Sequence, residues 1–343
     1  MSPRRRLGVA LLLDPPVAVE VDGLRRALGD SSLTAVAPHL TLVPPINVRT
    51  GDLDDALGIM RRAAAAHPGP LHLSLGPAAT FVPASPVVYL AVGGPDFDRL
   101  ASLRDDVLSG PFLRPDRWPW VPHVTIADQA MAPLAEAALT ALKHYQAEAG
   151  FERVVVLEER QHRWHPLADA DLGPPVVVGR GGLELEITQG RLLGPDVLAL
   201  VETELGETGC GPAQANPALA NDEEPSGGHG PGAGGESIVL TGRREGRVAG
   251  VAAAWSSGAT GEPVSVSVLV DRACRRQGVG RSLLVALEMS VGRRGWALEG
   301  VRGYGPSAFF NQSSAWVRTV APAFDAAGPS GGGGDGGHRP ARR

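Results

Sequence analysis

The sequence predicts an α+β protein of two domains, the first of them internally duplicated, and three observations support this prediction. The chain of 343 residues exceeds the usual size of one domain. Strand-like apolar runs alternate with helix-like amphipathic runs, first over residues 7–157 and again over residues 183–291. The sequences PHLTL, at residues 38–42, and PHVTI, at residues 122–126, nearly copy each other. We therefore expect two similar α/β lobes, followed by a mixed α/β domain.

The first lobe is expected to contain two helices among short strands. Residues 17–29 and the Ala-rich residues 52–66 have the apolar spacing of helices. Short apolar runs bounded by Pro, Gly and Asp predict strands over residues 7–13, 39–43, 71–75 and 87–92.

The second lobe repeats this rhythm. A helix near residues 96–108 leads into a loop rich in Pro and Trp over residues 111–120. A strand over residues 123–127, a helix near residues 132–148 and an apolar strand over residues 153–157 follow. Each lobe thus carries one His-x-Thr strand, as an internal duplication predicts.

Charge is distributed unevenly along the chain, whose formal net charge is −5. The net charge is −4 over residues 1–178, −8 over 179–239, +6 over 240–320 and +1 over 321–343. The basic segment favours an anionic ligand. The acidic first domain argues against a long RNA groove, because extended nucleic-acid binding relies on many Lys and Arg contacts.

Cysteine usage and the N-terminal residues lead us to expect a cytoplasmic protein. Cys210 and Cys274 lie in unlike contexts, which indicates neither a disulfide framework nor a zinc site. Three arginines before the first apolar run are similar to the start of a signal peptide, but Asp14-Pro15-Pro16 follows at once. No apolar run approaches the roughly 20 residues that cross a bilayer.

The paired His-x-Thr motifs carry the clearest chemistry. Strand side chains alternate between faces, so His39 and Thr41 project together, as do His123 and Thr125. Imidazole titrates near neutrality, so one histidine can accept a proton while the other, held protonated by a phosphate, donates one. Threonine hydroxyls can donate to the non-bridging oxygens of a phosphate. The alternative is that both histidines are buried structural residues, but this explains the duplicated motif poorly.

On these motifs the chain resembles the 2H phosphoesterase superfamily, whose bacterial members are called 2′-5′ RNA ligase-like or RNA 2′,3′-cyclic phosphodiesterases. The resemblance spans about residues 5–165. It implies two lobes around a cleft and the metal-free opening of a 2′,3′-cyclic phosphate or a related cyclic or 2′-5′ phosphodiester, without a cofactor. It assigns the acid and base roles jointly to His39 and His123, and phosphate binding to Thr41 and Thr125. The resemblance leaves open which histidine is the acid.

The loops determine the choice of substrate, and there the aromatic residues are the candidates. Phe81, Tyr89, Trp118 and Trp120 can stack on a base, although core packing explains the first two equally well. A nucleotide or an RNA end fits the acidic domain better than a long RNA. The run from His162 to His165 lacks the cysteines or carboxylates of a metal site. We expect the remaining histidines of this domain to be structural or surface residues: His67, His72 and His144.

A glycine-rich turn marks the second domain. Residues 236–254 predict a hairpin that turns at residues 243–247, and residues 264–270 predict a further strand. The run from Arg275 to Ser282 then leads into a helical stretch from Leu283 to Val291. Glycines between a strand and a helix let backbone N–H groups approach an anion such as a pyrophosphate.

This order of elements resembles the GNAT acyltransferases, whose pyrophosphate loop the run from Arg275 to Gly280 matches. Residues 183–187 and 196–204 supply a first strand and helix, so the resemblance covers about residues 180–325. It implies acetyl-CoA as the ligand. The residues that the resemblance assigns to acetyl-CoA lie on the strand end and on the loop: Val268, Leu269, Val270, Gln277, Gly278, Val279, Gly280, Arg281 and Ser282.

The chain departs from the GNAT pattern near its end. Neither the Asn that often follows the next strand nor the Tyr that can protonate the leaving thiolate is clearly in place between Tyr304 and Asn311. Tyr304 is a possible substitute. Cys274 is expected to be a loop residue, because no base lies near it in sequence.

We therefore expect three parts along the chain. Residues 1–178 form the phosphoesterase domain, 179–325 the GNAT-like domain with a flexible segment over 206–236, and 326–343 a disordered tail. Phosphodiester hydrolysis is the favoured activity. Two alternatives stay open: an acetyltransferase whose first domain senses RNA or a nucleotide, and a protein of two binding modules without catalysis.

Overall fold

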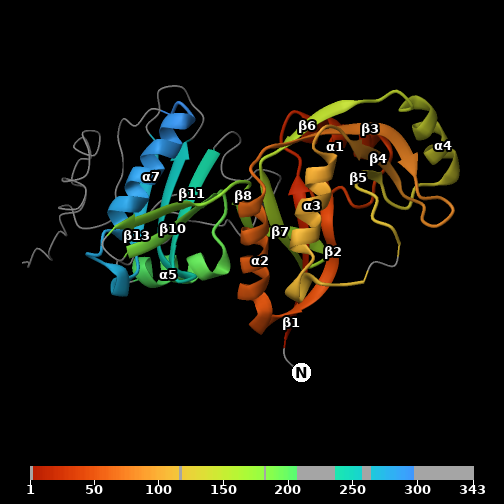
Figure 1. The fold of residues 1–343 in the computed structure, drawn as a ribbon. Coiled ribbons are helices and arrows are strands. Elements are labelled where there is room, and N and C mark those ends of the chain that lie inside the picture. The colour runs from red at the N-terminus through yellow and green to blue at the C-terminus, as the bar shows by residue number, and fades with distance from the viewer. Residues whose placement is uncertain (1–2, 116–117, 181–182, 207–235, 257–263, 297–343) are drawn as a thin grey trace, which may run out of the picture.

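The computed structural model describes residues 3–115, 118–180, 183–206, 236–256 and 264–296. They form a mixed α+β protein in two regions that lie side by side, as Figure 1 shows. The first region holds two four-stranded sheets and the second a five-stranded sheet, and every strand pairing is antiparallel. This confirms the α+β prediction. None of the described helices is long and apolar enough to span a membrane.

The first sheet has the strand order β2-β1-β7-β8. Its central strands are nearly continuous apolar runs because they are covered on both faces. The outer strands extend further along the chain than the apolar runs alone predict. The bounds are β1 (Arg4–Leu12), β2 (His39–Arg49), β7 (Arg153–Arg160) and β8 (Arg163–Asp171).

The second sheet has the strand order β5-β4-β3-β6. Its edge strand β5 contacts β2, the edge strand of the first sheet, so the two His-x-Thr strands are neighbours although 84 positions separate their histidines. The bounds are β3 (Leu71–Thr80), β4 (Val88–Gly93), β5 (His123–Ala127) and β6 (Ala147–Phe151).

Four helices cover the outer faces of these two sheets. Helix α2 (Leu53–Ala66) buries apolar residues at helical spacing and packs on β7 and β8, beside α3 (Phe97–Val107). Helix α4 (Ala132–Ala141) packs on β3 and β4. Helix α1 (Val17–Ala27) precedes β2 in the chain but contacts β5 and β6 of the other sheet. A short 3₁₀ turn precedes α2 and another follows α3, over Thr50–Asp52 and Gly110–Phe112.

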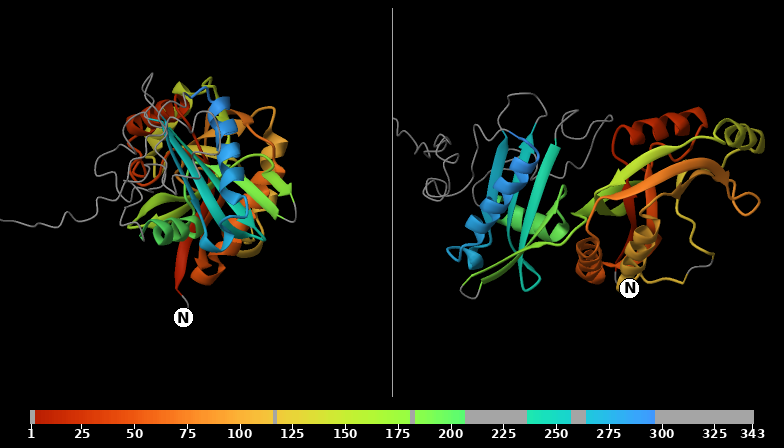
Figure 2. Two further views of the ribbon diagram at one scale, coloured as in Figure 1. Left: turned by 90° about the vertical axis from the view of Figure 1, so that its left-hand side faces the viewer. Right: turned by 45° about the horizontal axis from the view of Figure 1, so that its top comes forward.

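The second region is one sheet between two helices. Its strand order is β13-β12-β11-β10-β9. Helix α7 packs on one face through residues such as Leu283, and α5 packs on the other through residues such as Val197 (Figure 2, right). The bounds are β9 (Val176–Arg180), β10 (Leu183–Gly190), α5 (Pro195–Gly206), β11 (Glu236–Arg244), β12 (Arg247–Ser256), β13 (Ser265–Val270), a 3₁₀ turn (Arg272–Cys274) and α7 (Val279–Arg293).

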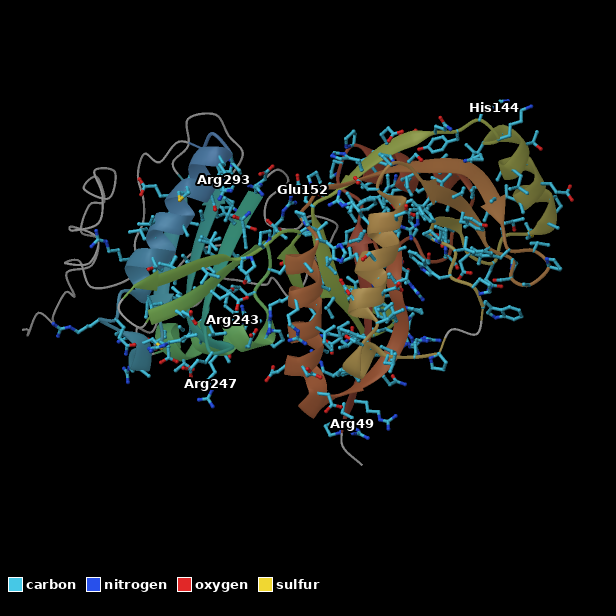
Figure 3. The ribbon with its side chains drawn as sticks, viewed as in Figure 1. Arg49, His144, Glu152, Arg243, Arg247 and Arg293 are labelled. Atoms are coloured by element: carbon cyan, nitrogen blue, oxygen red, sulfur yellow. The ribbon has the colours of Figure 1, made fainter. Side chains whose placement is uncertain are left out.

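Polar contacts join the two regions. Asp196, in the first turn of α5, accepts hydrogen bonds from Arg243 at 2.6 Å and from Arg61 of α2 at 3.5 Å. Glu152 pairs with Arg191 at 3.4 Å, and both Arg243 and Glu152 are labelled in Figure 3. A cavity of about 20 Å³ lies at this junction, large enough to hold a water molecule, and Arg61 and Arg243 line it.

Asp169 of β8 holds the start of the second region. Its carboxylate accepts the N–H groups of Arg191 at 3.0 Å and Leu192 at 2.9 Å, just after β10. Burial raises the pKa of Asp169 to about 6, although Arg153 and these N–H groups oppose that rise. The junction is therefore built from polar contacts, and among them the side chains of Asp169 and Arg243 are buried.

One expected element is wrong in part. The helix predicted to reach residue 148 ends at Ala141, and residues 147–151 form β6 instead. Ala149 and Phe151 alternate inward there and pair with β3, so burial on a sheet overrides the local helical propensity. The strands β8 and β9 were not predicted, because Pro166 and the charges of β8 hide its alternation.

Other predictions concern the boundaries of the two domains, the flexible segment and the C-terminal tail. The boundary expected after residue 178 falls inside β9, and the chain passes from one sheet to the next between Asp171 and Val176. The segment expected to be flexible lies almost wholly outside the described residues, as do residues 297–343 with Tyr304 and the expected tail. The second-region strands and helices expected over residues 183–291 are otherwise confirmed within the described ranges.

Candidate active site

His39 is the first residue of β2, and its ring is fixed by the backbone. Nδ1 lies 2.8 Å from the carbonyl oxygen of Ala37. A carbonyl oxygen only accepts, so Nδ1 must carry the proton of this hydrogen bond. The neutral ring then leaves Nε2 as the free proton acceptor.

His123 is placed in the same way as the first residue of β5. Its Nδ1 lies 2.7 Å from the carbonyl oxygen of Val121, two residues earlier. The same tautomer follows, with Nε2 free. Both rings are half-buried, which suits groups that must meet a substrate while being shielded from bulk water.

The two threonines lie on the same faces as the histidines. Thr41 pairs with Ala10 and His39 with Leu12 across β2 and β1. Thr125 pairs with Tyr89 across β5 and β4. Directly opposite residues of antiparallel strands share a face, so each threonine stands beside its histidine, away from the core residues between them.

The two strands bring the histidines into one electrostatic environment. The pKa of His39 is lowered first by burial, then by the positive charges of Arg25 and of protonated His123. Burial also lowers the pKa of His123. Trp120, just before β5, donates its Nε1–H to the carbonyl of Thr41 at 3.4 Å. The structure thus places the two motifs on strands that contact each other.

Aromatic rings surround His123 but not His39 among the described residues. Phe81 and Tyr89 stack with their ring centroids 4.3 Å apart. The His123 ring meets Phe81 edge-on at 5.0 Å and Tyr89 at 5.2 Å. Both rings considered for stacking or for the core therefore touch a predicted catalytic residue.

The two loop tryptophans differ from each other. Trp118 has 78% of its surface exposed and is free to meet a ligand. Trp120 packs against the core, with the Arg104 guanidinium 4.7 Å from its ring centroid. Its hydrogen bond to Thr41 gives it a structural function, so of the two only Trp118 stays a candidate for base stacking.

The other histidines stand apart from this site. The His162 side chain is fully exposed in the turn between β7 and β8. His67 ends α2 and bonds Asp106 at 2.8 Å. His144 lies between α4 and β6, on the side of the first region away from the junction (Figure 3). In the part of the chain that the structure describes, no three His, Cys, Asp or Glu side chains gather as metal ligands.

The glycine-rich turn of the second region lies between β13 and α7. Gly278 is the N-cap of α7 with φ +89°, a left-handed conformation that glycine adopts without strain. Arg275 holds the loop by donating Nε–H to the carbonyl of Val270 at 3.1 Å and by pairing with Glu204 of α5. Arg244 donates to the Gln277 side chain at 2.7 Å.

One residue expected to bind through its backbone is already engaged. The N–H of Ser282 donates to the carbonyl of Gly278 at 3.0 Å, as the first internal bond of the helix. This N–H group is therefore used within α7, and the assignment of Ser282 to acetyl-CoA stays a prediction. The free N–H groups of a helix lie in its first turn, here at Val279, Gly280 and Arg281.

Two histidines with free Nε2 atoms and two threonine hydroxyls thus lie on adjoining strands, an arrangement that suits acid–base chemistry. Residues 13–163 match the family model described as the 2'-5' RNA ligase superfamily, so the first region contains a domain of that superfamily. The matched residues include both His-x-Thr motifs.

Similar solved structures are found at low identity. LigT of E. coli with NADP+ is 20% identical, at a TM-score of 0.38, over 50% of this chain and 99% of LigT. LigT with 3'-AMP is 19% identical, at a TM-score of 0.36, over the same shares of the two chains. TT0787 of Thermus thermophilus is 20% identical, at a TM-score of 0.37, over 49% of this chain and 97% of its own.

The comparisons add little for the second region. The aminoglycoside acetyltransferase meta-AAC0020, from an uncultured soil metagenomic sample and in complex with trehalose, is 15% identical at a TM-score of 0.23. The match covers 36% of this chain and 79% of that one. None of the curated proteins compared with this chain matches it.

Proposed function

We propose that the first region is a metal-independent phosphodiesterase that opens a 2′,3′-cyclic phosphate, or a related cyclic or 2′-5′ phosphodiester, of a nucleotide or an RNA end. The observation that carries the proposal is the matched pair of imidazoles. Each Nδ1–H is tied to a carbonyl two residues earlier, at 2.8 Å for His39 and 2.7 Å for His123, so each Nε2 is free. Membership of the 2'-5' RNA ligase superfamily supports this class of chemistry.

The reaction divides between the two rings. One neutral imidazole takes a proton from water as the water oxygen forms its bond to phosphorus. The bond from phosphorus to one ribose oxygen breaks, and the other imidazole, held protonated by the phosphate, gives its proton to that oxygen. The product is a phosphate monoester. Thr41 and Thr125 donate to the non-bridging oxygens, where charge develops.

The test is hydrolysis of nucleoside 2′,3′-cyclic monophosphates by the full chain in EDTA. We expect turnover to a single 2′- or 3′-phosphate, lost in the double variant His39→Ala, His123→Ala. His162→Ala is the matched control, because that side chain is fully exposed and should leave the rate unchanged. Turnover that survives in the double variant would refute the two-histidine mechanism. No turnover by the native chain, with binding of the nucleotide, would favour the sensor or the binding-module alternative.

For the second region we propose acetyl-CoA binding, because one specific observation favours it. The turn after β13 places Gly278 at the N-cap of α7 with positive φ. The N–H groups of the first helical turn have no partner within the helix, so they can donate to an anion. Arg276, two residues before Gly278, also has positive φ, at +63°. The strand end from Val268 to Val270 precedes this turn directly. Transfer of the acetyl group is a further step of the proposal.

Calorimetry with acetyl-CoA tests this assignment. Gly278→Glu should abolish binding, because it adds a side chain and a negative charge at the turn. Gly295→Glu, at the other end of α7, is the matched control: its φ is also positive, at +67°, and a side chain there meets open space. Equal affinity in the two variants would remove the pyrophosphate-loop assignment, and consumption of acetyl-CoA with an amine would extend it to catalysis.

A further inference from the structure

Arg25 of α1 is a buried cation that the reaction described above does not use. It is 2% exposed, and a charged side chain is rarely so buried unless it is paired. Its guanidinium donates to Asp30 at 2.7 Å, to the Val36 carbonyl at 3.0 Å and to the Ser32 hydroxyl at 3.2 Å. These acceptors lie on the segment that leads into His39, so Arg25 fixes the entry to β2.

Asp30 extends this network to the other half of the site. Its side chain is fully buried, and besides Arg25 and Ser32 it accepts the backbone N–H of Asp128 at 3.1 Å. Asp128 directly follows β5, the strand that begins at His123. One carboxylate therefore bonds to the segment before the first histidine and to the end of the strand that carries the second.

We propose that Arg25 and Asp30 are positioning residues for catalysis, which fix the segment entering His39 relative to the strand of His123 and hold a buried guanidinium beside the His39 imidazole. The proposal deepens the phosphodiesterase function proposed above and rests on it. Neither residue touches the reacting atoms. They act through the placement of His39 and through the charge it experiences.

The charges around His39 give the pair a second effect. The charged and titratable groups that face it are Arg25 from α1 and His123 from β5, with Asp30 and Asp22 beside Arg25. Because a nearby cation disfavours the protonated ring, the loss of Arg25 raises the pKa of His39. The loss of the Asp30 charge leaves Arg25 less compensated and lowers that pKa. If Arg25 and Asp30 had only a structural role, their loss would not shift the pKa of His39 in opposite directions.

The experiment follows the His39 ring through a pH titration by NMR in the full chain, beside the pH profile of kcat/KM. We expect Arg25→Gln to move the His39 midpoint to higher pH and Asp30→Asn to move it to lower pH. Arg25→Lys keeps the positive charge but loses the several N–H donors of the guanidinium. The midpoint of the His39 titration should therefore stay unchanged, while kcat falls about 10-fold or more with little change in KM. Arg153→Gln, which changes a partly buried arginine at the junction, is the matched control.

The two readouts separate the failure of this proposal from the failure of the function. The limb of the pH profile that moves with the His39 midpoint identifies its role: the acidic limb if His39 is the base, the alkaline limb if it is the acid. If the chain hydrolyses no phosphodiester, the titration of the His39 ring still tests whether Arg25 and Asp30 control its pKa. Midpoints that stay fixed, or that move in one direction in both variants, would overturn the proposal. If Arg25→Gln does not fold, Asp30→Asn and Arg25→Lys carry the same test.

Discussion

The two halves of the candidate site share their backbone geometry and differ in what surrounds it. The β2 half-site consists of His39 and Thr41, and the β5 half-site of His123 and Thr125. In each, the histidine begins an edge strand and bonds the carbonyl two residues before it. The threonine follows on the same face. A duplicated five-residue motif thus fixes the same local arrangement twice.

The surroundings give the two rings different electrostatic environments. The β2 half-site lies near the buried Arg25 and near aliphatic residues of β1. The β5 half-site lies against the stacked rings of Phe81 and Tyr89. A cation opposes protonation of its neighbour, whereas the faces of aromatic rings carry negative charge density. Nearly identical motifs therefore lie in different environments, which residues distant in sequence provide.

Loss of either histidine should have the largest effect. His39→Ala and His123→Ala should each lower kcat/KM for a 2′,3′-cyclic nucleotide by at least ~10²-fold, because each removes an acid or a base. Steady-state kinetics at several pH values measures the loss, with circular dichroism to check the fold. A single variant that keeps native activity would contradict the division of roles, since one half-site would then be sufficient.

The sequence predicts the first region well because its signals are local. Apolar alternation and helical spacing indicate most strands and helices, and the two pentapeptides mark all four site residues. The motifs do not show how far apart they lie in space: β2 contacts β5 across two separate sheets, and α1 also packs on the second sheet. Such long-range pairing leaves no periodic trace in either strand.

Other features of the site could not be predicted from the sequence, because they too depend on contacts between residues distant in sequence. Nothing local marks Arg25 and Asp30, because a charged side chain on a helix or in a turn is ordinarily solvated. The strand β6 has a helix-like composition and is set by its pairing with β3. Phe81 and Tyr89 were visible as candidates, but their stacking against His123 depends on the register of β4 with β5.

Loss of a threonine hydroxyl should have the next largest effect. Thr41→Val and Thr125→Val keep the shape of the side chain and remove the donor to a phosphate oxygen, so kcat should fall about 10- to 100-fold each. Competition by inorganic phosphate reports whether binding weakens as well. Thr140→Val on α4 is the control, because its hydroxyl only bonds the Glu136 carbonyl. An equal loss in the control would point to stability rather than to the site.

A change in the aromatic pair should affect one half-site only. Phe81→Leu removes the edge contact with His123, and aromatic contacts of this kind contribute about 1 kcal/mol. We expect kcat/KM to fall about 3- to 10-fold, with a shifted NMR titration of His123 and an unshifted one of His39. Phe97→Leu, at the partly exposed start of α3, serves as the control. Equal shifts in both rings would show that the two environments are coupled.

The smallest effect should appear in the pH dependence of stability. Both histidines have a pKa below the ordinary 6.5 in the folded chain. The unfolded chain therefore binds more protons as the pH falls below 6.5, so each histidine makes the folded state less stable there and has no effect above it. His39→Gln and His123→Gln should each flatten this loss, which urea unfolding at pH 5.0 and 7.5 measures.

The two variants should reduce the loss of stability at low pH by different amounts. In both rings burial lowers the pKa and the hydrogen bond to a backbone carbonyl opposes it, but only His39 is also lowered by the charges of Arg25 and His123, so His39→Gln should flatten the curve more. Asp169, whose pKa is raised to about 6, favours the folded state as the pH falls through the same range. Its contribution is common to native chain and variants and cancels in the difference. Equal flattening would mean that Arg25 contributes little to the difference between the half-sites.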